Sequence, residues 1–348
     1  MKKIGCLVIN VGTPNSTETS DVKNYLNEFL MDPQVISIPF IFRWIFVKIL
    51  IAPRRAPASA EKYKKVWMAE GSPLLVLTRR FASLLEKKLG SIKIEVAMRY
   101  GNPTISSACK NLISAGCEKI VIFPQYPQYA FASTFSGEER ARKELEELNF
   151  KGEVTVVQPF YEDPGYLQSW LDKLIPLKNS HDHVLFSFHG LPLAQLKGKI
   201  EGCQGTDECC HRPQACALNC YRAQSIRTVE RLAEAMQLPK EKYSYSFQSR
   251  LGPVEWIRPY TDQVLAALPK QGVKKLCVVV PSFVTDCLET LEEIAIEGEK
   301  TFLSNGGEKF TFVPCLNDDL RWVDAAAVLV EKAAALPASV HEKPILVF

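Results

Sequence analysis

The sequence lacks long blocks of charge of one sign, low-complexity stretches and any compositional mark of disorder. Its 42 basic and 39 acidic side chains leave a net charge of only +3, without the basic surface typical of nucleic-acid-binding proteins. Histidine is also scarce, with five in 348 residues. Because 47% of the residues are hydrophobic, the chain can form the cores of two ordinary domains. We therefore expect a folded globular protein without a nucleic-acid partner.

The amino terminus lacks the features of a secretory signal. Its apolar run, residues 4–11, is short and ends at Gly12-Thr13-Pro14 without a small-residue cleavage site. We interpret the run as a buried strand and expect a cytoplasmic protein. Eleven cysteines would indicate disulfides in a secreted chain, but in a reducing cytosol free thiols or metal ligands are the better expectation.

One segment, residues 36–52 (ISIPFIFRWIFVKILIA), is almost wholly apolar and rich in aromatic side chains. It is too short to span a bilayer, which needs roughly 20 apolar residues, and Pro39, Arg43 and Lys48 interrupt it. Two alternatives remain. The segment forms an interfacial helix or apolar lip, with Trp44, Arg43 and Lys48 at the level of lipid headgroups, or it forms a helix buried in the core.

The same structural plan occurs twice along the chain. Three pairs of segments match in the same order: residues 4–14 with 183–192, residues 116–124 with 272–281, and residues 154–166 with 310–322. Their continuous Val, Ile and Leu runs are typical of strands buried on both faces of a parallel sheet that helices cover. The sequence therefore predicts an α/β fold of two doubly wound, Rossmann-like domains, residues 1–177 and 178–348.

Helical patterns separate the predicted strands, at residues 21–30, 74–89, 104–114, 138–148, 166–174, 225–236 and 288–303. Ligands of such sheets bind beyond the carboxyl ends of the strands. Unusual polar residues follow the predicted strands there, at residues 10–13, 125–126, 189–190 and 282–283. We expect a ligand site in a cleft between the two domains.

His189 is the first candidate for chemistry. It ends a predicted strand and precedes Gly-Leu-Pro, so we expect its imidazole to project into the cleft. Imidazole, with an ordinary pKa of about 6.5, can accept a proton at physiological pH. A single histidine at a strand end is often only structural, however, so position alone does not decide between the two roles.

A row of acidic residues follows the equivalent strand of the second half. It comprises Asp286, Glu289, Glu293 and Glu297, at offsets of three, seven and eleven. An α-helix beginning near residue 285 or 286 would bring all of them onto one face. Acidic residues in a first helical turn ordinarily only complement the helix dipole. A stripe of carboxylates also repels itself, and a path for cations would relieve that repulsion.

Several motifs spread over the whole chain carry a family resemblance. They are residues 10–14 (NVGTP), 29–36 (FLMDPQVI), 59–74, 99–103 (RYGNP), 124–134 (PQYPQYAFAST), 186–192 (FSFHGLP), 247–262 and 283–294. Together they resemble the ferrochelatases of haem synthesis. The resemblance implies a class II chelatase-like fold and a lyase that inserts Fe(II) into protoporphyrin IX with release of two protons. Coproporphyrin III as substrate, cobalt as metal, and a non-catalytic haem or iron-sulfur binding protein remain as alternatives.

The resemblance also implies roles for the candidate residues. His189 corresponds to the active-site histidine and Glu289 to the carboxylate that faces it, with the Fe(II) substrate between them. Asp286 and Glu293 match acidic positions along a metal route. Because metalation removes two N–H protons from the porphyrin, we assign His189 as the principal base and Glu289 as its partner.

Further positions match porphyrin-binding motifs: Val11, Arg99, Tyr100, Ser133, Ser249, Arg250 and Trp256. Guanidinium groups suit the propionates of a porphyrin, and Trp256 and Val11 suit its flat apolar face. Each of these residues could instead only support the fold. The expected partners are protoporphyrin IX and ferrous iron. If residues 36–52 form an apolar lip, they would place the protein peripherally at the inner face of a membrane.

An insertion at about residues 202–220 concentrates five cysteines: Cys203, Cys209, Cys210, Cys216 and Cys220. Cys216 and Cys220 would share a helix face, and Cys203 with one of the adjacent pair could complete a four-thiolate site. We assign Cys210 as the fourth ligand, with Cys209 as its alternative. The spacing permits zinc or an iron-sulfur cluster. The resemblance to bacterial ferrochelatases with internal cysteines implies a [2Fe-2S] cluster.

Overall fold

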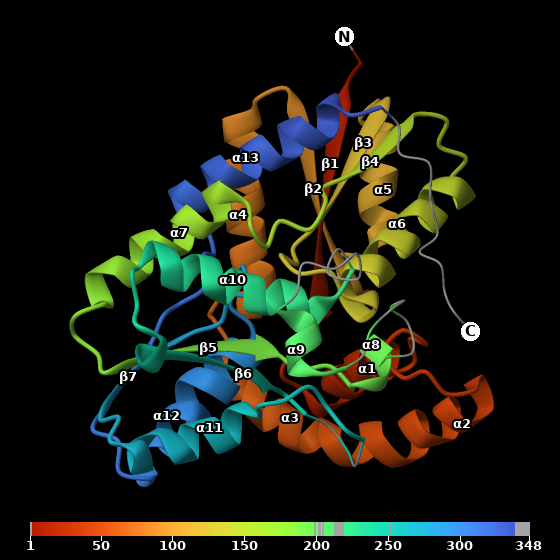
Figure 1. Cartoon of the computed structure of the whole chain (residues 1–348). Helices are drawn as coiled ribbons and strands as arrows, with labels where there is room; N and C mark the ends of the chain where they lie inside the picture. Colours follow the sequence, from red (N-terminus) through yellow and green to blue (C-terminus); the bar gives the residue numbers. More distant parts are fainter. Residues whose placement is uncertain are drawn as a thin grey trace. The chain divides into compact units, whose positions relative to one another are not determined.

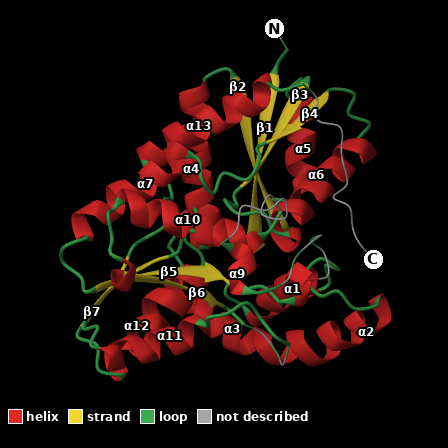
Figure 2. Cartoon of the chain, in the orientation of Figure 1, coloured by secondary structure: helices red, strands yellow, loops and turns green. Residues whose placement is uncertain are grey.

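The computed structural model describes residues 2–197, 200, 203, 205–211, 219–250, 252 and 254–337. The described chain forms two parallel sheets of four strands each, with helices between successive strands (Figures 1 and 2). The predicted fold class is therefore confirmed: both halves are α/β, and the Val, Ile and Leu runs are strands whose residues are almost all buried.

The first sheet has the strand order β2-β1-β3-β4. Its strands are β1 (Ile4–Thr13), β2 (Ile92–Gly101), β3 (Lys119–Pro124) and β4 (Glu153–Val156). We use η for a 3-10 or π-helix. The helices between β1 and β4 are α1 (Thr19–Leu30), α2 (Phe40–Ile45), η1 (Phe46–Ile51), α3 (Ala52–Val66), α4 (Pro73–Leu89), α5 (Ile105–Ser114), η2 (Phe131–Phe135) and α6 (Ser136–Glu147).

The second sheet repeats this order as β6-β5-β7-β8. Its strands are β5 (His183–His189), β6 (Tyr243–Gln248), β7 (Lys275–Val279) and β8 (Lys309–Phe312). The remaining helices are α7 (Pro164–Leu174), η3 (Ile175–Leu177), α8 (Ala194–Lys197), α9 (Asp207–Cys210), α10 (Tyr221–Ala235), η5 (Lys240–Lys242), α11 (Thr261–Ala267), η6 (Leu268–Gln271), η7 (Glu289–Gly298), α12 (Glu299–Ser304) and α13 (Leu320–Ala335). The identical order supports the duplication inferred from the sequence.

A glycine at the end of the first strand of each repeat explains part of the repeated motif. A Cβ atom on Gly12, which has φ +114°, would lie 1.8 Å from the carbonyl oxygen of Tyr100 on β2. A Cβ atom on Gly190 would lie 2.7 Å from the carbonyl oxygen of Gln248 on β6. Only glycine permits so close an approach of neighbouring backbones.

The described chain forms two compact units, and each consists of more than one stretch of sequence. Unit 1 contains residues 2–125, 131–158 and 317–337, and unit 2 contains residues 126–130 and 159–316. A boundary at residue 177 separates the strands of the two sheets, but the helix after each last strand belongs to the other unit. Thus α7 follows β4 and belongs to unit 2, whereas α13 follows β8 and belongs to unit 1.

An aromatic residue near the start of each exchanged helix is fully buried. Trp322 of α13 stacks on Phe81 of α4, with ring centroids 5.8 Å apart. The hydroxyl of Tyr166 of α7 donates to the carbonyl of Pro281, at 2.5 Å. Tyr166 and Trp322 also end the third pair of matching segments in the sequence. Burial of such large rings anchors each helix in its unit.

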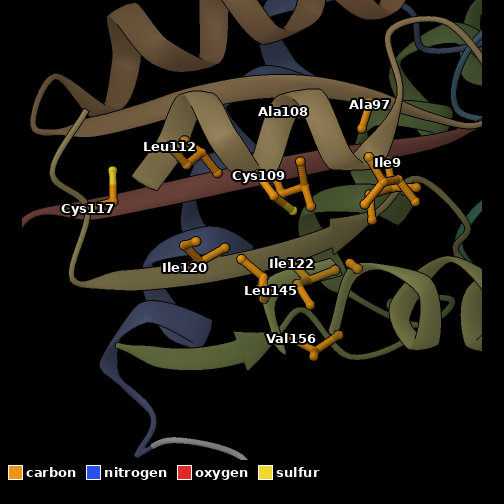
Figure 3. Close-up of a cluster of buried hydrophobic side chains, with 13 residues drawn as sticks. Ile9, Ala97, Ala108, Cys109, Leu112, Cys117, Ile120, Ile122, Leu145 and Val156 are labelled. Carbon is orange, nitrogen blue, oxygen red and sulfur yellow. The ribbon is translucent and has the colours of Figure 1, made fainter. Parts of the chain in front are cut away.

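One face of the first sheet packs on α5 and α6, as Figure 3 shows. The strands contribute Leu7, Ile9, Ile120 and Ile122, all fully buried. Against them pack Ala108, Cys109, Leu112, Ala141 and Leu145. Burial of apolar surface at roughly 25 cal/mol per Å² is the main contribution of this core to stability.

Candidate functional site

His189 ends β5, which lies between β6 and β7, and its side chain is half-buried. Two hydrogen bonds fix its backbone: its amide donates to Ser282 Oγ at 3.1 Å, and its carbonyl accepts from the Tyr221 hydroxyl at 2.8 Å. His189 Nδ1 lies 2.7 Å from the carbonyl oxygen of Gly190. A carbonyl only accepts, so this contact assigns the proton of a neutral ring to Nδ1 and leaves the lone pair on Nε2.

Glu289 and Glu293 lie in the first half of η7, and Glu293 interacts electrostatically with both His189 and Glu289. The Glu293 carboxylate accepts from the Ser249 amide at 2.8 Å and from the Ser249 hydroxyl at 2.5 Å. Burial raises the pKa of Glu293, and the charge of Glu289 adds to this rise, while the Ser249 hydrogen bonds and His189 oppose it. Unit 2 thus brings His189, Glu289 and Glu293 into one electrostatic group.

Gln248 belongs to this group, although the sequence analysis did not identify it. It is buried at the end of β6, directly opposite His189 in the parallel register. Its Nε2 donates to the Glu289 carbonyl at 3.1 Å, and its Oε1 accepts from the Ser187 hydroxyl at 2.7 Å. Its place at a strand end beside His189 is the signal that could have identified it.

The predicted α-helical stripe of carboxylates is wrong in two respects. Asp286 precedes the helix, which begins at Leu288, and the following segment is a π-helix with i→i+5 hydrogen bonds. The residue offsets of an α-helical face therefore do not apply. Asp286 is buried, and its carboxylate accepts from the Thr290 hydroxyl at 2.8 Å and the Cys315 amide at 3.2 Å.

In unit 1, Arg99 and Tyr100 are both bound by a carboxylate that the sequence analysis missed. Oδ2 of buried Asp32 accepts from Arg99 at 2.5 Å, from the Tyr100 hydroxyl at 2.8 Å and from the Ser136 hydroxyl at 2.8 Å. The Arg99 guanidinium also lies over the Tyr100 ring, 4.6 Å from its centroid. Burial raises the pKa of Tyr100, so its hydroxyl stays protonated and donates. Porphyrin contact by Arg99 and Tyr100 stays a prediction.

Val11 and Ser133 are half-buried residues of unit 1. Val11 precedes Gly12 at the end of β1, as His189 precedes Gly190 at the end of β5. The two repeats therefore place valine and histidine at corresponding positions. Ser133 lies in η2.

Trp256 and Arg250 belong to the segment that follows β6 in unit 2. A Cβ atom on Gly190 would approach the Trp256 ring to 3.3 Å, so the half-buried indole lies beside the residue after His189. Arg250 is more exposed and donates to Asp262 at 2.6 Å. The structure therefore brings Trp256 toward the His189 group, and it engages Arg250 in a surface ion pair.

A sequence model described as Ferrochelatase matches residues 3–334. The chain belongs to the ferrochelatase family. A ferrochelatase of Bdellovibrio bacteriovorus is 46% identical over 335 residues, which are 95% of this chain and 99% of that protein. A ferrochelatase of Pseudomonas fluorescens strain Pf0-1 is 44% identical over 332 residues, 94% of this chain and 97% of that protein.

Among solved structures, SirB from Bacillus subtilis with Fe3+ resembles this ferrochelatase-family chain with a TM-score of 0.53. The match covers 96% of each chain at 11% sequence identity. At that identity the likeness shows the fold alone.

In this family member, three of the predicted cluster cysteines lie near one another. The buried sulfurs of Cys209 and Cys210 are 3.9 Å apart, at the end of α9. A hydrogen bond from Cys210 lowers the pKa of Cys220 to about 7. Cys203 is half-buried, and Cys216 lies outside the described residues. Among the residues described, no group of three or more His, Cys, Asp or Glu side chains is arranged to hold a metal ion. The gathered thiols suit an iron-sulfur or zinc site chemically, but the ligand set stays a prediction.

An exposed apolar surface covers α2 and η1. Its members are Ile38, Phe40, Ile41, Phe42, Trp44, Ile45, Phe46, Ile49 and Leu50. The alternative of a helix buried in the core is therefore wrong. The headgroup position expected for Arg43 is also wrong, because its side chain is buried and donates to the carbonyls of Ile36 and Ile38 at 3.1 and 2.9 Å. No helix in the described part of the chain is both long and apolar enough to cross a membrane.

Proposed function

We propose that the chain is a protoporphyrin ferrochelatase, a lyase that inserts Fe(II) into protoporphyrin IX and releases two protons in haem biosynthesis. Family membership over nearly the whole chain supports the reaction class. The observation that carries the assignment to residues is the grouping of His189, Glu289 and Glu293 in unit 2. An imidazole next to carboxylates supplies both the proton acceptor and the negative charge that metalation needs.

In this proposal His189 Nε2 accepts a pyrrole proton, because the Nδ1 contact with Gly190 leaves the lone pair on Nε2. The positive charge that forms on the imidazole is stabilised by Glu289 and Glu293. Glu289 then takes part in removing the second proton or in the approach of the metal. Metalation consumes the Fe(II) substrate and replaces two N–H bonds by metal–nitrogen bonds, so charge is conserved when two protons leave.

The proposed metal route uses Glu293 more than Asp286. Among the described residues, Glu293 receives hydrogen bonds from the neutral amide and hydroxyl of Ser249, which leave its charge available to a cation. The Asp286 carboxylate accepts from Thr290 and Cys315, an arrangement that favours holding the residues before η7 in place. For the porphyrin itself, Trp256 beside Gly190 is the best-supported contact, since an indole can stack on a flat ring.

The function is tested by anaerobic incubation of the purified protein with Fe(II) and either protoporphyrin IX or coproporphyrin III, while free-base fluorescence is followed. We expect rapid loss of protoporphyrin fluorescence, and at least about 100-fold slower loss with His189→Ala, since general-base catalysis contributes roughly 10²–10⁴-fold. Metalation of coproporphyrin alone would favour the alternative substrate, and faster reaction with Co(II) the alternative metal. Metalation of neither porphyrin would refute the enzyme assignment, and an unimpaired His189→Ala variant would refute the proposed base.

We also propose a [2Fe-2S] cluster bound by Cys203, Cys210, Cys216 and Cys220, with Cys209 as the alternative to Cys210. The proximity of the Cys209, Cys210 and Cys220 sulfurs supports it. Protein purified anaerobically should be brown and contain acid-labile sulfide. Cys220→Ser should abolish both signals, whereas Cys117→Ser, in unit 1, should leave them intact. A colourless protein containing zinc would favour the alternative metal, and unchanged absorbance in Cys220→Ser would exclude that ligand.

The exposed apolar surface supports a peripheral position at the inner face of a membrane, in an otherwise cytoplasmic protein. Lys48, Arg54 and Arg55 are exposed on the same helical stretch, and residues 36–60 contain no acidic side chain. Apolar groups with flanking cations are typical of binding to an anionic lipid interface. Ile41→Asn should reduce co-sedimentation with phosphatidylglycerol vesicles about tenfold, as burial of one such side chain contributes roughly 1.5–3 kcal/mol. Leu320→Asn, an equally exposed leucine of unit 1, is the matched control, and equal loss in both variants would contradict the proposed surface.

A further inference from the structure

We infer that Gln248 is a positioning residue that fixes the first turn of η7 and, through it, the direction of the Glu289 side chain. The inference rests on the proposed roles of His189 and Glu289. It adds a residue that contributes no proton and binds no metal.

Three groups of Gln248, its side-chain oxygen, its side-chain nitrogen and its backbone carbonyl, each form a hydrogen bond with a different part of unit 2. Its side-chain Oε1 accepts from Ser187 of β5, and its Nε2 donates to the carbonyl of Glu289 in η7. Its backbone carbonyl accepts from the Gly190 amide at 2.8 Å, directly after His189. Because Ser187 and Glu289 engage opposite ends of the amide, the side chain has one orientation that satisfies both. Gln248 therefore connects the residue that follows His189 to the backbone of Glu289.

The type of helix makes this connection important. η7 is a π-helix from its first turn, and π-helical turns are rare and occur frequently at functional sites. The bond from Gln248 acts on the backbone of Glu289, so it influences where the Cα–Cβ bond of Glu289 points. The loss of a buried donor to this carbonyl would let the turn relax toward other geometries.

The next residue makes a second connection to the same helix. Ser249 has φ +67°, a left-handed conformation that is uncommon for serine. In that conformation both its amide and its hydroxyl donate to the Glu293 carboxylate. Two successive residues thus hold η7 at positions four apart, Gln248 by the helix backbone and Ser249 by a side chain. Backbone strain of this kind persists only where surrounding contacts maintain it.

Gln248 is only 3% exposed, so its expected effect is on the reacting groups rather than on substrate binding. Gln248→Met keeps the approximate side-chain shape and removes both side-chain hydrogen bonds. We expect kcat for Fe(II) insertion to fall about 10- to 100-fold, since small misplacements of reacting groups have effects of that order. The KM for porphyrin should change less than about twofold.

A double-mutant cycle with Glu289→Gln tests whether Gln248 acts through Glu289. If it does, Gln248→Met should lower kcat much less in the Glu289→Gln background than in the wild-type background. A merely structural role would lower kcat by the same factor in both backgrounds, and that result would overturn the inference. An increase in KM with kcat unchanged would also overturn it, because it would indicate a role in porphyrin binding.

Ser187→Ala is the second variant, because it releases only the Oε1 end of the amide. We expect a smaller fall in kcat in the same direction, with KM unchanged. If Gln248→Met does not fold, as judged by circular dichroism, Ser187→Ala decides alone, and wild-type kcat would then overturn the inference. Wild-type protein and His189→Ala, measured in the same assay, distinguish a failure of the Gln248 inference from a failure of the proposed function. Slow His189→Ala with a fully active Gln248→Met refutes only the role of Gln248, whereas a fully active His189→Ala refutes the proposed function.

Discussion

Gly12 and Gly190 occupy corresponding positions in the two repeats, and different groups surround them. Beside Gly12, unit 1 has an apolar side chain, Val11, while the nearby Asp32 carboxylate is bound by the Arg99 guanidinium and two hydroxyl groups. Beside Gly190, unit 2 has His189, which interacts electrostatically with Glu293 of η7. The corresponding strand ends therefore differ in chemistry. In unit 1 an arginine and a carboxylate form a buried ion pair, and in unit 2 an imidazole and the Glu293 carboxylate interact electrostatically. Under the proposed function, only the second strand end supplies reacting groups.

The largest effect that would sharpen this comparison is expected from Asp32→Ala. It would leave a largely buried guanidinium without its anion, and the breaking of a buried ion pair costs roughly 3–5 kcal/mol of stability. Urea unfolding at pH 7 measures the loss. His189→Ala, at the first strand end of the other repeat, should change the free energy of unfolding by less than about 1 kcal/mol. Similar losses of stability in the two variants would mean that His189, like Asp32, contributes mainly to the fold.

A smaller effect is expected from Tyr100→Phe, which removes one of the three donors to Oδ2 of Asp32. Hydrogen bonds to charged groups contribute about 1.5–3 kcal/mol, and Arg99 and Ser136 still satisfy the carboxylate, so we expect a loss near the lower value. Thermal unfolding at several denaturant concentrations measures this loss in the free energy of unfolding. If stability does not change while the KM for porphyrin rises, Tyr100 contacts the substrate and the unit 1 network is not purely structural.

Glu293→Gln should have the smallest effect, with the opposite sign. The pKa of Glu293 is raised in the folded protein, mainly by burial, so the folded state binds its proton more tightly than the unfolded state does. Ionisation of this group therefore weakens the fold as pH rises above the ordinary glutamate value of 4.5. The glutamine variant should be more stable than wild type at neutral pH, and the gain should disappear below pH 4.5. A constant difference across the pH range would mean that ionisation of Glu293 does not cause it.

Much of the fold could be predicted because its signals are local. The buried parallel strands follow from uninterrupted apolar runs, and the repeated glycine after the first strand follows from the close approach of two backbones. The position of His189 at the end of a strand could be predicted because the apolar run ends there. The predicted helices at residues 74–89 and 104–114 lie within one residue of α4 and α5.

The features that escaped prediction depend on partners distant in sequence. Asp32 gains its role only when β2 brings Arg99 to it across 67 positions. The sequence predicts Arg43 to be a surface cation, but its side chain is buried and donates to the carbonyls of Ile36 and Ile38, within a segment whose apolar side chains are exposed. The π-helical form of η7 cannot be predicted from residue spacing with an α-helical period. Asp286 was placed on the helix face because the helix was expected to begin two or three residues earlier than it does.

The exchange of α7 and α13 has a consequence for how the protein is made. During synthesis, the sheet of unit 1 emerges from the ribosome long before Trp322, the residue that covers Phe81. Until then the apolar side chains of α4 that pack against α13 stay exposed to solvent, and a nascent chain in this state is vulnerable to aggregation. A gene fragment ending at residue 177 would therefore encode the sheet of unit 1 without α13, the helix that packs on α4.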